Sequence, residues 1–420
     1  GSSPDLAEPL TNADLLENAA HGIVANGDVN LPAVTVTEKT DVGAGTSAGS
    51  VVVFRAASLA STGALTIVSI TIEGDTLDDG ADNNDDNNIN IVVLWMNTTV
   101  TGNVVVVGST ATNCSSGEFL IERNKLLSGA PATEVLIEGN LSSTNNGSTV
   151  GLIEINHSSL SMGDGAAGGN INIGAGGEFI VDPSTVTFNT DNTGLTAGAG
   201  ATVDVRGNFS GNSIFTSATD INYFLDLANA ANVILSRTNI NAGGTGEIMI
   251  QVGGVANITG CEFSNLDADG LQFMNGVLFN GFSDCNFING QDPGSHISFL
   301  GTAAANGGGI FNADNIRFDD STGFVPTTDA GSLVNNVGGA NVEVSFRVAT
   351  GSDFGVGAVD ISAADAEDDD NDGTTATDVT WDDNAPSLVI DANTGSPTTL
   401  GSDTGNVTHF LFDLDRKSVV

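Results

Sequence analysis

The chain has 420 residues, with 52 acidic and 10 basic side chains and a formal net charge of −42. So acidic a surface repels the phosphates of nucleic acids and of anionic membrane surfaces, which excludes both as partners. No apolar run reaches the roughly 18 residues of a membrane-spanning helix, so we expect no membrane insertion. A hydrophobic fraction of 40% also excludes a disordered polyanion.

Three cysteines, Cys114, Cys261 and Cys285, are too few and too scattered for a disulfide framework or a Cys-rich zinc site. The chain starts Gly1-Ser2-Ser3-Pro4, without Met. We interpret it as a processed secreted chain, or as one that carries a short tag remnant. We therefore expect it to be extracellular or at the cell surface.

Residues 1–30 differ in character from the rest of the chain. Leu6–Ala20 is predicted to form a short helix, because Asn12 can cap it and Leu15, Leu16 and Ala19 share one face. We expect this segment either to cover the first coil of the fold or to join it to a neighbouring chain.

Residues 31–354 are repetitive. Cys, Phe and Asn recur at the same offsets in two runs, Cys261–Asn265 and Cys285–Asn289. Weaker copies extend this series with a mean step of about 26 residues. Its apolar anchors are Leu141, Leu160, Phe188, Phe209, Ile240, Phe263, Phe287, Phe318 and Phe346. A second series keeps step with the first: Leu225, Ile248, Leu271, Ile297 and Leu333.

The short strands within each repeat alternate. Ile248, Ile250 and Val252 point to one face, and Met249 and Gln251 to the other. Alternating strands, turns rich in Gly and Asn, and a fixed repeat predict an all-β fold, the right-handed parallel β-helix or β-solenoid, with coils of roughly 23–31 residues. β-Sandwich domains, the alternative, would not place Cys, Phe and Asn at the same offsets in successive units.

On the two runs Cys261–Asn265 and Cys285–Asn289, the chain resembles the right-handed parallel β-helix superfamily, which includes pectate-lyase-like enzymes and many adhesins. The resemblance covers roughly residues 130–350, and more loosely residues 30–130. It implies the fold and no particular activity, because the superfamily hosts enzymes, adhesins and structural fibres.

The repeat also predicts a core ladder. Phe263 and Phe287 are expected to point inward from successive coils. Cys261 and Cys285 are expected to stack as buried thiols rather than as a disulfide, because an in-register ladder rarely gives the torsion that a disulfide needs. Asn265 and Asn289 are expected to form a ladder of side-chain amides along the axis.

Two acidic clusters are candidates for Ca²⁺. Asp368, Asp370 and Asp372, followed by Gly373, match the start of a calcium loop, in which hard oxygen ligands alternate before a tight turn. Val379 stands where such a loop usually has a bidentate Glu, and Asp378 lies beside it. The second cluster includes Asp82 and Asp86. Solvated polar loops are the alternative in both places.

An enzyme would need an acid, a base or an oxyanion stabiliser. Asp319 and Asp320 beside Arg317 are the best carboxylate pair, and His296 is the nearest imidazole in sequence. These residues form no catalytic spacing that we recognise. We therefore expect no enzymatic activity, with a polysaccharide lyase or hydrolase as the alternative.

Residues 355–420 form an Asp-rich C-terminal segment with a final strand, Val407–Leu414, followed by the basic residues Arg416 and Lys417. We expect this terminus to contact a neighbouring copy, with the two basic residues reaching an acidic surface. The functional expectation is a structural protein of an extracellular filament, sheath or surface layer. It would form a homopolymer favoured by salt or Ca²⁺, because like-charged subunits repel unless screened. The alternative is an adhesin that binds a polysaccharide or a cell surface.

Overall fold

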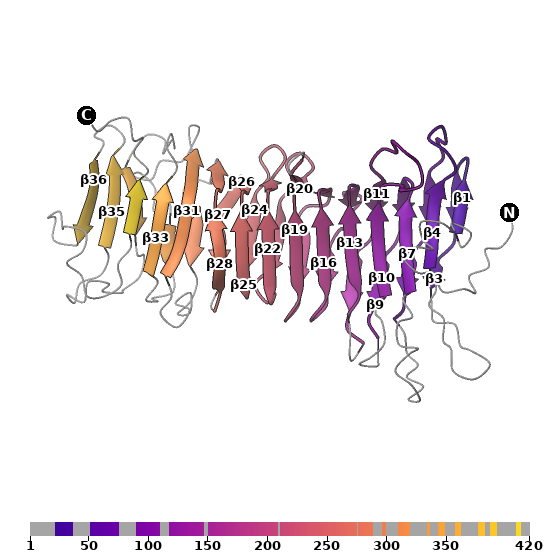
Figure 1. The fold of residues 1–420 in the computed structure, drawn as a ribbon, viewed down its shortest axis with the longest axis horizontal. Coiled ribbons are helices and arrows are strands. Elements are labelled where there is room, and N and C mark those ends of the chain that lie inside the picture. The colour runs from indigo at the N-terminus through magenta and orange to yellow at the C-terminus, as the bar shows by residue number, and fades with distance from the viewer. Residues whose placement is uncertain are drawn as a thin grey trace. The chain divides into compact units, whose positions relative to one another are not determined.

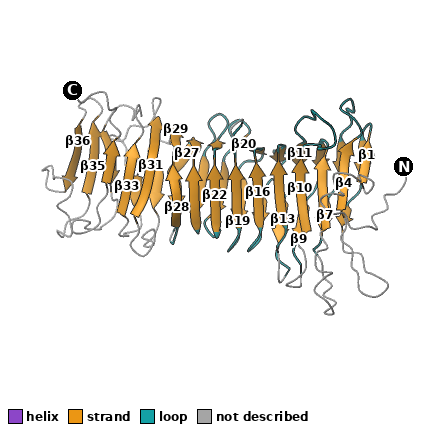
Figure 2. Ribbon diagram, viewed as in Figure 1, coloured by secondary structure: helices purple, strands orange, loops and turns teal. Residues whose placement is uncertain are grey.

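The computed structural model describes residues 22–36, 51–74, 90–109, 117–146, 150–208, 211–274, 276–288, 296–299 and 310–319, and six later strands. The chain divides into two units, Gly1–Ile221 and Asn222–Val420. In both, the described residues are strands joined by loops (Figure 1, Figure 2). The described part of the chain contains no helix that is long and apolar enough to cross a membrane.

The first unit is built from three parallel sheets, A, B and C, to which each coil contributes one strand in turn. Sheet A contains β1 (Gly22–Ala25), β4 (Val51–Ala56), β7 (Asn90–Trp95), β10 (Gly117–Glu122), β13 (Leu152–Asn156), β16 (Glu178–Asp182) and β19 (Thr202–Arg206). Sheet B contains β2 (Val29–Leu31), β5 (Leu65–Ile67), β8 (Thr98–Val100), β11 (Glu134–Ile137), β14 (Ser159–Met162), β17 (Thr185–Phe188) and β20 (Ser213–Ser217). Sheet C contains β3 (Val34–Val36), β6 (Ile70–Ile72), β9 (Val104–Val107), β12 (Leu141–Thr144), β15 (Ile171–Ile173) and β18 (Thr193–Ala197).

The core of this unit consists of apolar columns that run from coil to coil. Every second residue of a strand points inward and pairs with its equivalent in the next strand of the same sheet. One column of sheet A contains Val52, Val92, Phe119, Ile153, Phe179 and Val203, all buried. Burial of each such side chain stabilises the fold by about 1.5–3 kcal/mol, so the stack is held together mainly by its inward columns.

The second unit repeats the same plan. Sheet A contains β22 (Asn232–Ser236), β25 (Val255–Thr259) and β28 (Leu278–Ser283), and sheet B contains β23 (Thr238–Asn241), β26 (Glu262–Ser264) and β29 (Asn286–Ile288). The long strand β31 (Ile310–Asp319) pairs with both β28 and β29. Sheet C contains β21 (Tyr223–Leu227), β24 (Ile248–Val252), β27 (Leu266–Phe273), β30 (Ile297–Phe299) and β32 (Val334–Asn336).

The predicted parallel β-helix is confirmed. The repeat register is confirmed from Ile240 to Phe318 in the second unit, but in the first unit Leu160 pairs with Val186 and not with the expected Phe188. Ile240, Phe263, Phe287 and Phe318 occupy one column of sheet B. The second series occupies sheet C, where Leu225, Ile250, Leu271 and Ile297 pair in succession, with Ile250 in place of the expected Ile248. Leu141 was assigned to the first series, but it lies in sheet C and pairs with Val104 and Ile171. Phe209 and Leu333 lie outside the described residues.

Coil length varies more than the expected 23–31 residues. Glu262 pairs with Asn286 in the next coil, as expected, but the coil that starts at Val53 ends only at Val93. The extra length lies in the connections, since residues 75–89 are inserted between β6 and β7. The first strand begins at Gly22, within the segment 1–30 that the sequence sets apart, and the predicted helix Leu6–Ala20 lies outside the described residues.

The topology changes near the C-terminus. β33 (Glu343–Val348) pairs in parallel with β31, and β37 (His409–Phe412), within the predicted final strand, pairs in parallel with β33. Phe346, expected in the first series, lies in β33 and pairs with Ala313. β34 (Ala358–Ser362), β35 (Thr377–Asp382) and β36 (Ser387–Ala392) form an antiparallel sheet. This stretch of the Asp-rich segment therefore does not continue the coil pattern.

Candidate interaction surfaces

The Cys and Phe residues of the predicted ladder lie on neighbouring rungs. Phe263 pairs with Phe287, and the two buried rings stack with their centroids 5.0 Å apart. Cys261 and Cys285 are buried and free. The Cys261 thiol donates to the Leu235 carbonyl at 3.2 Å. Burial, reinforced by the Cys261 thiol, raises the pKa of Cys285 well above its usual value, so this thiol is a poor nucleophile.

The position of the two thiols corresponds to a hydroxyl position in the first unit. There, at the corner between sheets A and B, the Ser184 hydroxyl accepts a hydrogen bond from the Ser158 amide at 3.1 Å and donates to the Asp182 carbonyl at 2.9 Å. Ser213 follows, and its hydroxyl accepts from the Ser184 amide at 3.4 Å. In both units, small side chains at the corner between sheets A and B thus donate to backbone carbonyls. The role of the two cysteines is therefore to stabilise this corner.

An asparagine ladder is present, at a turn other than the predicted one. The Asn103 Oδ1 accepts from the Asn140 amide at 2.9 Å, and Asn140 Oδ1 from the Asn170 amide at 3.0 Å. Of the predicted pair, Asn265 adopts a positive φ of 62°, and its side-chain amide donates to the Ala242 carbonyl of the preceding coil at 3.5 Å. Asn289 lies outside the described residues.

Of the proposed cation and assembly residues, the structure describes Asp378 alone. Asp82, Asp86, Asp368, Asp370, Asp372, Arg416 and Lys417 lie outside the described residues. Asp378 lies in β35, where its backbone pairs with Ser362 and Asp391. Within the described ranges, no group of three or more His, Cys, Asp or Glu side chains is placed to hold a metal ion.

The residues named for an enzymatic alternative likewise form no site within the described part of the chain. Arg317 and Asp319 lie in β31, and Asp320 lies outside the described residues. His296 is 1% exposed, with its ring 5.5 Å from that of Phe287. That imidazole is therefore part of the core.

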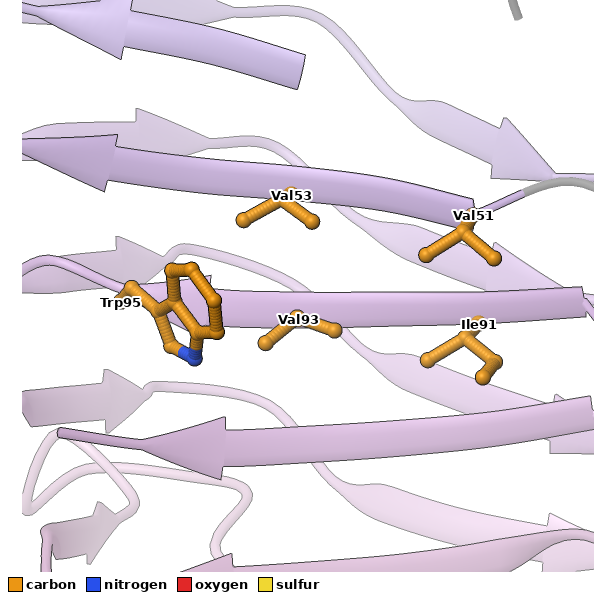
Figure 3. Close-up of a cluster of buried hydrophobic side chains, with 5 residues drawn as sticks. All are labelled: Val51, Val53, Ile91, Val93 and Trp95. Carbon is orange, nitrogen blue, oxygen red and sulfur yellow. The ribbon is translucent and has the colours of Figure 1, made fainter. Parts of the chain in front are cut away.

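The outer face of sheet A carries a second apolar cluster, which the sequence did not reveal. Val51, Val53, Ile91, Val93 and Trp95 point away from the solenoid core on β4 and β7 (Figure 3), yet each is at most 3% exposed. Leu120 and Leu126 pack against them. Since the protein itself covers these side chains, this part of the face is closed to a ligand.

A buried carboxylate borders this cluster. Trp95 Nε1 donates to Glu122 Oε2 at 3.0 Å, and Lys125 Nζ forms an ion pair with Glu122 Oε1. Both oxygens of a carboxylate that is almost inaccessible to water are thus satisfied, which a buried charge requires. Trp95 and Glu122 lie 27 positions apart, on adjacent rungs, so only the coil register could have predicted their contact.

Further along sheet A, carboxylates and aliphatic side chains alternate on the outer face. Glu118 lies between Ile91 and Leu152, and Glu154 lies between Leu120 and Ile180. The alternation keeps like charges off directly opposite positions, where they would be destabilising. Glu118 and Glu154 remain diagonal neighbours. Burial, with a smaller effect from Glu154, raises the pKa of Glu118 to about 7.

Glu118→Gln is expected to stabilise the protein at pH 8 and to change little at pH 4.5. The unfolded chain releases the Glu118 proton near the ordinary glutamate pKa of 4.5 and the folded chain only near 7, so stability falls as the pH rises through that window. Above pH 7 the gain from the substitution is on the order of 1–3 kcal/mol. Denaturant unfolding at both pH values measures it, with the exposed Glu178→Gln as control. Equal stability of Glu118→Gln and the parent at pH 8 would contradict this account.

A second carboxyl group with a raised pKa lies at an irregularity of sheet C in the second unit. The register between β24 and β27 shifts between Ile248 and Ile250, so Asp267–Gly270 protrude as a bulge. Burial, followed by the nearby Asp269 charge, raises the pKa of Asp267 to about 6. The Asp269 amide donates to Asp267 Oδ1 at 3.2 Å. The hydrogen-bond partner of this carboxyl group therefore lies within the bulge.

Sheets B and C of the first unit present uncharged rows to solvent. Thr66, Thr99, Ser161, Thr187 and Thr216 belong to one outward row of sheet B, interrupted by Leu136. Successive rungs are about 4.8 Å apart. Such regular hydroxyl rows are the feature of this unit that best fits the alternative of glycan binding.

The core side chains of the first described coil are less buried than those of the next coil. In the first coil, Ile23, Val29, Leu31 and Val34 point inward and are partly exposed. Their partners one coil later, Phe54, Leu65, Ile67 and Ile70, are at most 2% exposed. Three of the four strongly exposed large apolar side chains in the described residues, Val24, Leu59 and Val68, belong to the first two coils. Apolar exposure is therefore concentrated at this end.

Within the part of the chain that the structure describes, the backbone of the first coil is also paired on one side only. Among the described residues, β1 pairs only with β4, β2 only with β5, and β3 only with β6. The Val34 amide donates to Ser69 and the Val36 carbonyl accepts from Glu73, so these groups face the second coil. In a parallel pair, alternate residues face opposite neighbours. The amide and carbonyl of Thr35, and likewise of Asn30, therefore face away from the second coil.

Comparison with family models, with curated proteins and with solved structures finds no match for this chain.

Proposed function

We propose that the chain is a secreted structural protein, a subunit of an extracellular filament, sheath or surface layer that assembles from copies of itself. The observation that carries the proposal is the first described coil, where partly exposed core side chains coincide with strands that pair on one side only among the described residues. An edge of this kind is a template for pairing with another chain. A solenoid grows by adding coils, so its end is the natural place for such pairing.

Charge sets the conditions for assembly. With a net charge of −42, copies repel one another at low ionic strength. The Debye length is about 10 Å at 0.1 M salt and about 3 Å at 1 M, so added salt removes most of this repulsion. Ca²⁺ would act at lower concentration by binding carboxylates, and Asp368, Asp370 and Asp372 remain the ligands that we propose for it.

Light scattering and negative-stain imaging of the full-length protein test this function. We expect monomers or small oligomers at low salt, and larger assemblies at high salt or with millimolar Ca²⁺. A version lacking residues 407–420 tests whether Arg416 and Lys417 contribute. A full-length protein that stays monomeric under all these conditions would contradict the proposal and favour the glycan-binding alternative.

A further inference from the structure

Two Asn-Gly pairs of the chain are described in full by the structure, Asn26-Gly27 and Asn280-Gly281. This dipeptide is chemically labile, because glycine has no Cβ to keep its backbone nitrogen away from the side chain of the preceding asparagine. The two pairs have the same sequence but lie in different local structures. Any difference in their reactivity therefore comes from the fold.

Asn26-Gly27 lies in the turn between β1 and β2. Both residues are exposed, and a methyl group added at Gly27 would meet no atom within 4 Å. The flanking residues Ala25 and Val29 are anchored to the next coil by backbone hydrogen bonds of 2.8 and 3.0 Å. The pair is thus held in a surface turn that leaves its side chain and backbone room to rotate.

Asn280-Gly281 lies within the strand β28. The residues on either side of Asn280 are paired with β25, Phe279 with Ala256 and Gly281 with Asn257. Asn280 is exposed, but the ladder fixes the backbone on both sides of it in an extended form. An extended backbone keeps the Gly281 nitrogen away from the side-chain carbonyl carbon of Asn280. The strand must therefore open locally before these two atoms can meet.

We propose that Asn26 is a site of spontaneous deamidation, converted to aspartate and isoaspartate in the folded protein. The Gly27 backbone nitrogen loses its proton and attacks Asn26 Cγ. The new bond closes a succinimide ring, and the side-chain nitrogen takes up a proton and leaves as ammonia. Water then opens the ring at either carbonyl carbon, which gives aspartate or isoaspartate. Each event adds a negative charge close to Asp28, and the inference is independent of the proposed function.

Peptide mapping by mass spectrometry measures the conversion at each site after the folded, full-length protein is incubated at pH 8 and 37 °C. We expect Asn26 to convert about tenfold faster than Asn280 or more, because only the strand has to open first. In denaturant the difference should vanish, since both dipeptides are then free to rotate. Equal rates in the folded protein, or faster conversion of Asn280, would overturn the inference.

Gly27→Ala tests the mechanism. The φ of Gly27 lies outside the left-handed region and the space beside it is open, so the variant should fold. Its methyl group stands next to the attacking nitrogen and should slow the conversion of Asn26 about tenfold. Asn26→Gln, which moves the carbonyl carbon one methylene away, should suppress the conversion as well.

Gly211→Ala is the matched control, because a methyl group there also meets no atom within 4 Å and lies in another coil. It should leave the conversion of Asn26 unchanged. Equal melting temperatures of the parent, Gly27→Ala and Gly211→Ala show that all three fold alike. Conversion of Asn26 in Gly27→Ala at the rate of the parent would overturn the inference.

Discussion

Phe287→Ala is expected to lower the free energy of unfolding by about 3–5 kcal/mol, the usual cost of truncating a fully buried Phe. The Phe287 ring is inaccessible to water, stacks on Phe263 and lies 6.3 Å from the ring of Phe282. In a stack of coils, each coil is stabilised by its neighbours. The cavity left by the missing ring therefore weakens the coil that contains residue 287 and also its contact with the neighbouring coil.

Urea unfolding followed by circular dichroism measures this loss. The adjacent residue Asn286 points outward from the same strand, so Asn286→Ala is the matched control and should change stability by no more than about 0.5 kcal/mol. A loss below about 1 kcal/mol for Phe287→Ala would mean that the ring is not in the core, and would refute the register of sheet B.

Gly254→Ala is expected to have the next largest effect. Gly254 has a φ of 60°, and a methyl group there would lie 2.2 Å from the Ala230 carbonyl oxygen in the preceding coil. The left-handed conformation costs a non-glycine residue about 1–2 kcal/mol. Forcing the two backbones apart adds about 1–3 kcal/mol.

Gly129→Ala separates the two contributions. Gly129 has a φ of 76°, and a methyl group there would meet no atom within 4 Å, so only the conformational cost applies. Melting temperatures should therefore fall further for Gly254→Ala than for Gly129→Ala. Equal effects would show that the coils do not approach each other as closely at Gly254 as the structure places them.

The fold was predictable because side-chain chemistry repeats at one coil length in the second unit. Cys261, Phe263 and Cys285, Phe287 recur at the same offsets because successive coils place them on the same corner and column. The wrong sheet for Leu141 has a simple cause. Connections of variable length shift the phase of the repeat, so the same series that reaches sheet B at Phe188 and Leu160 reaches sheet C at Leu141.

The interaction surfaces were less predictable, because they depend on what lies beside a residue in space. Nothing local to Trp95 or Glu122 indicates that they meet. Val34-Thr35-Val36 is an ordinary alternating strand in the sequence. Only the coil alignment shows that, among the described residues, it pairs on one side alone.

Hydrogen–deuterium exchange of the full-length protein at rising concentration tests most directly whether the first coil is the association edge. Amides that face an open edge exchange freely until a partner strand covers them. At high salt, the segment 29–36, which contains the Asn30 and Thr35 amides, should gain protection with concentration, while the interior segment 98–107 of the third coil should not change. Exchange from 29–36 that is independent of concentration, in a protein that does associate, would contradict the account.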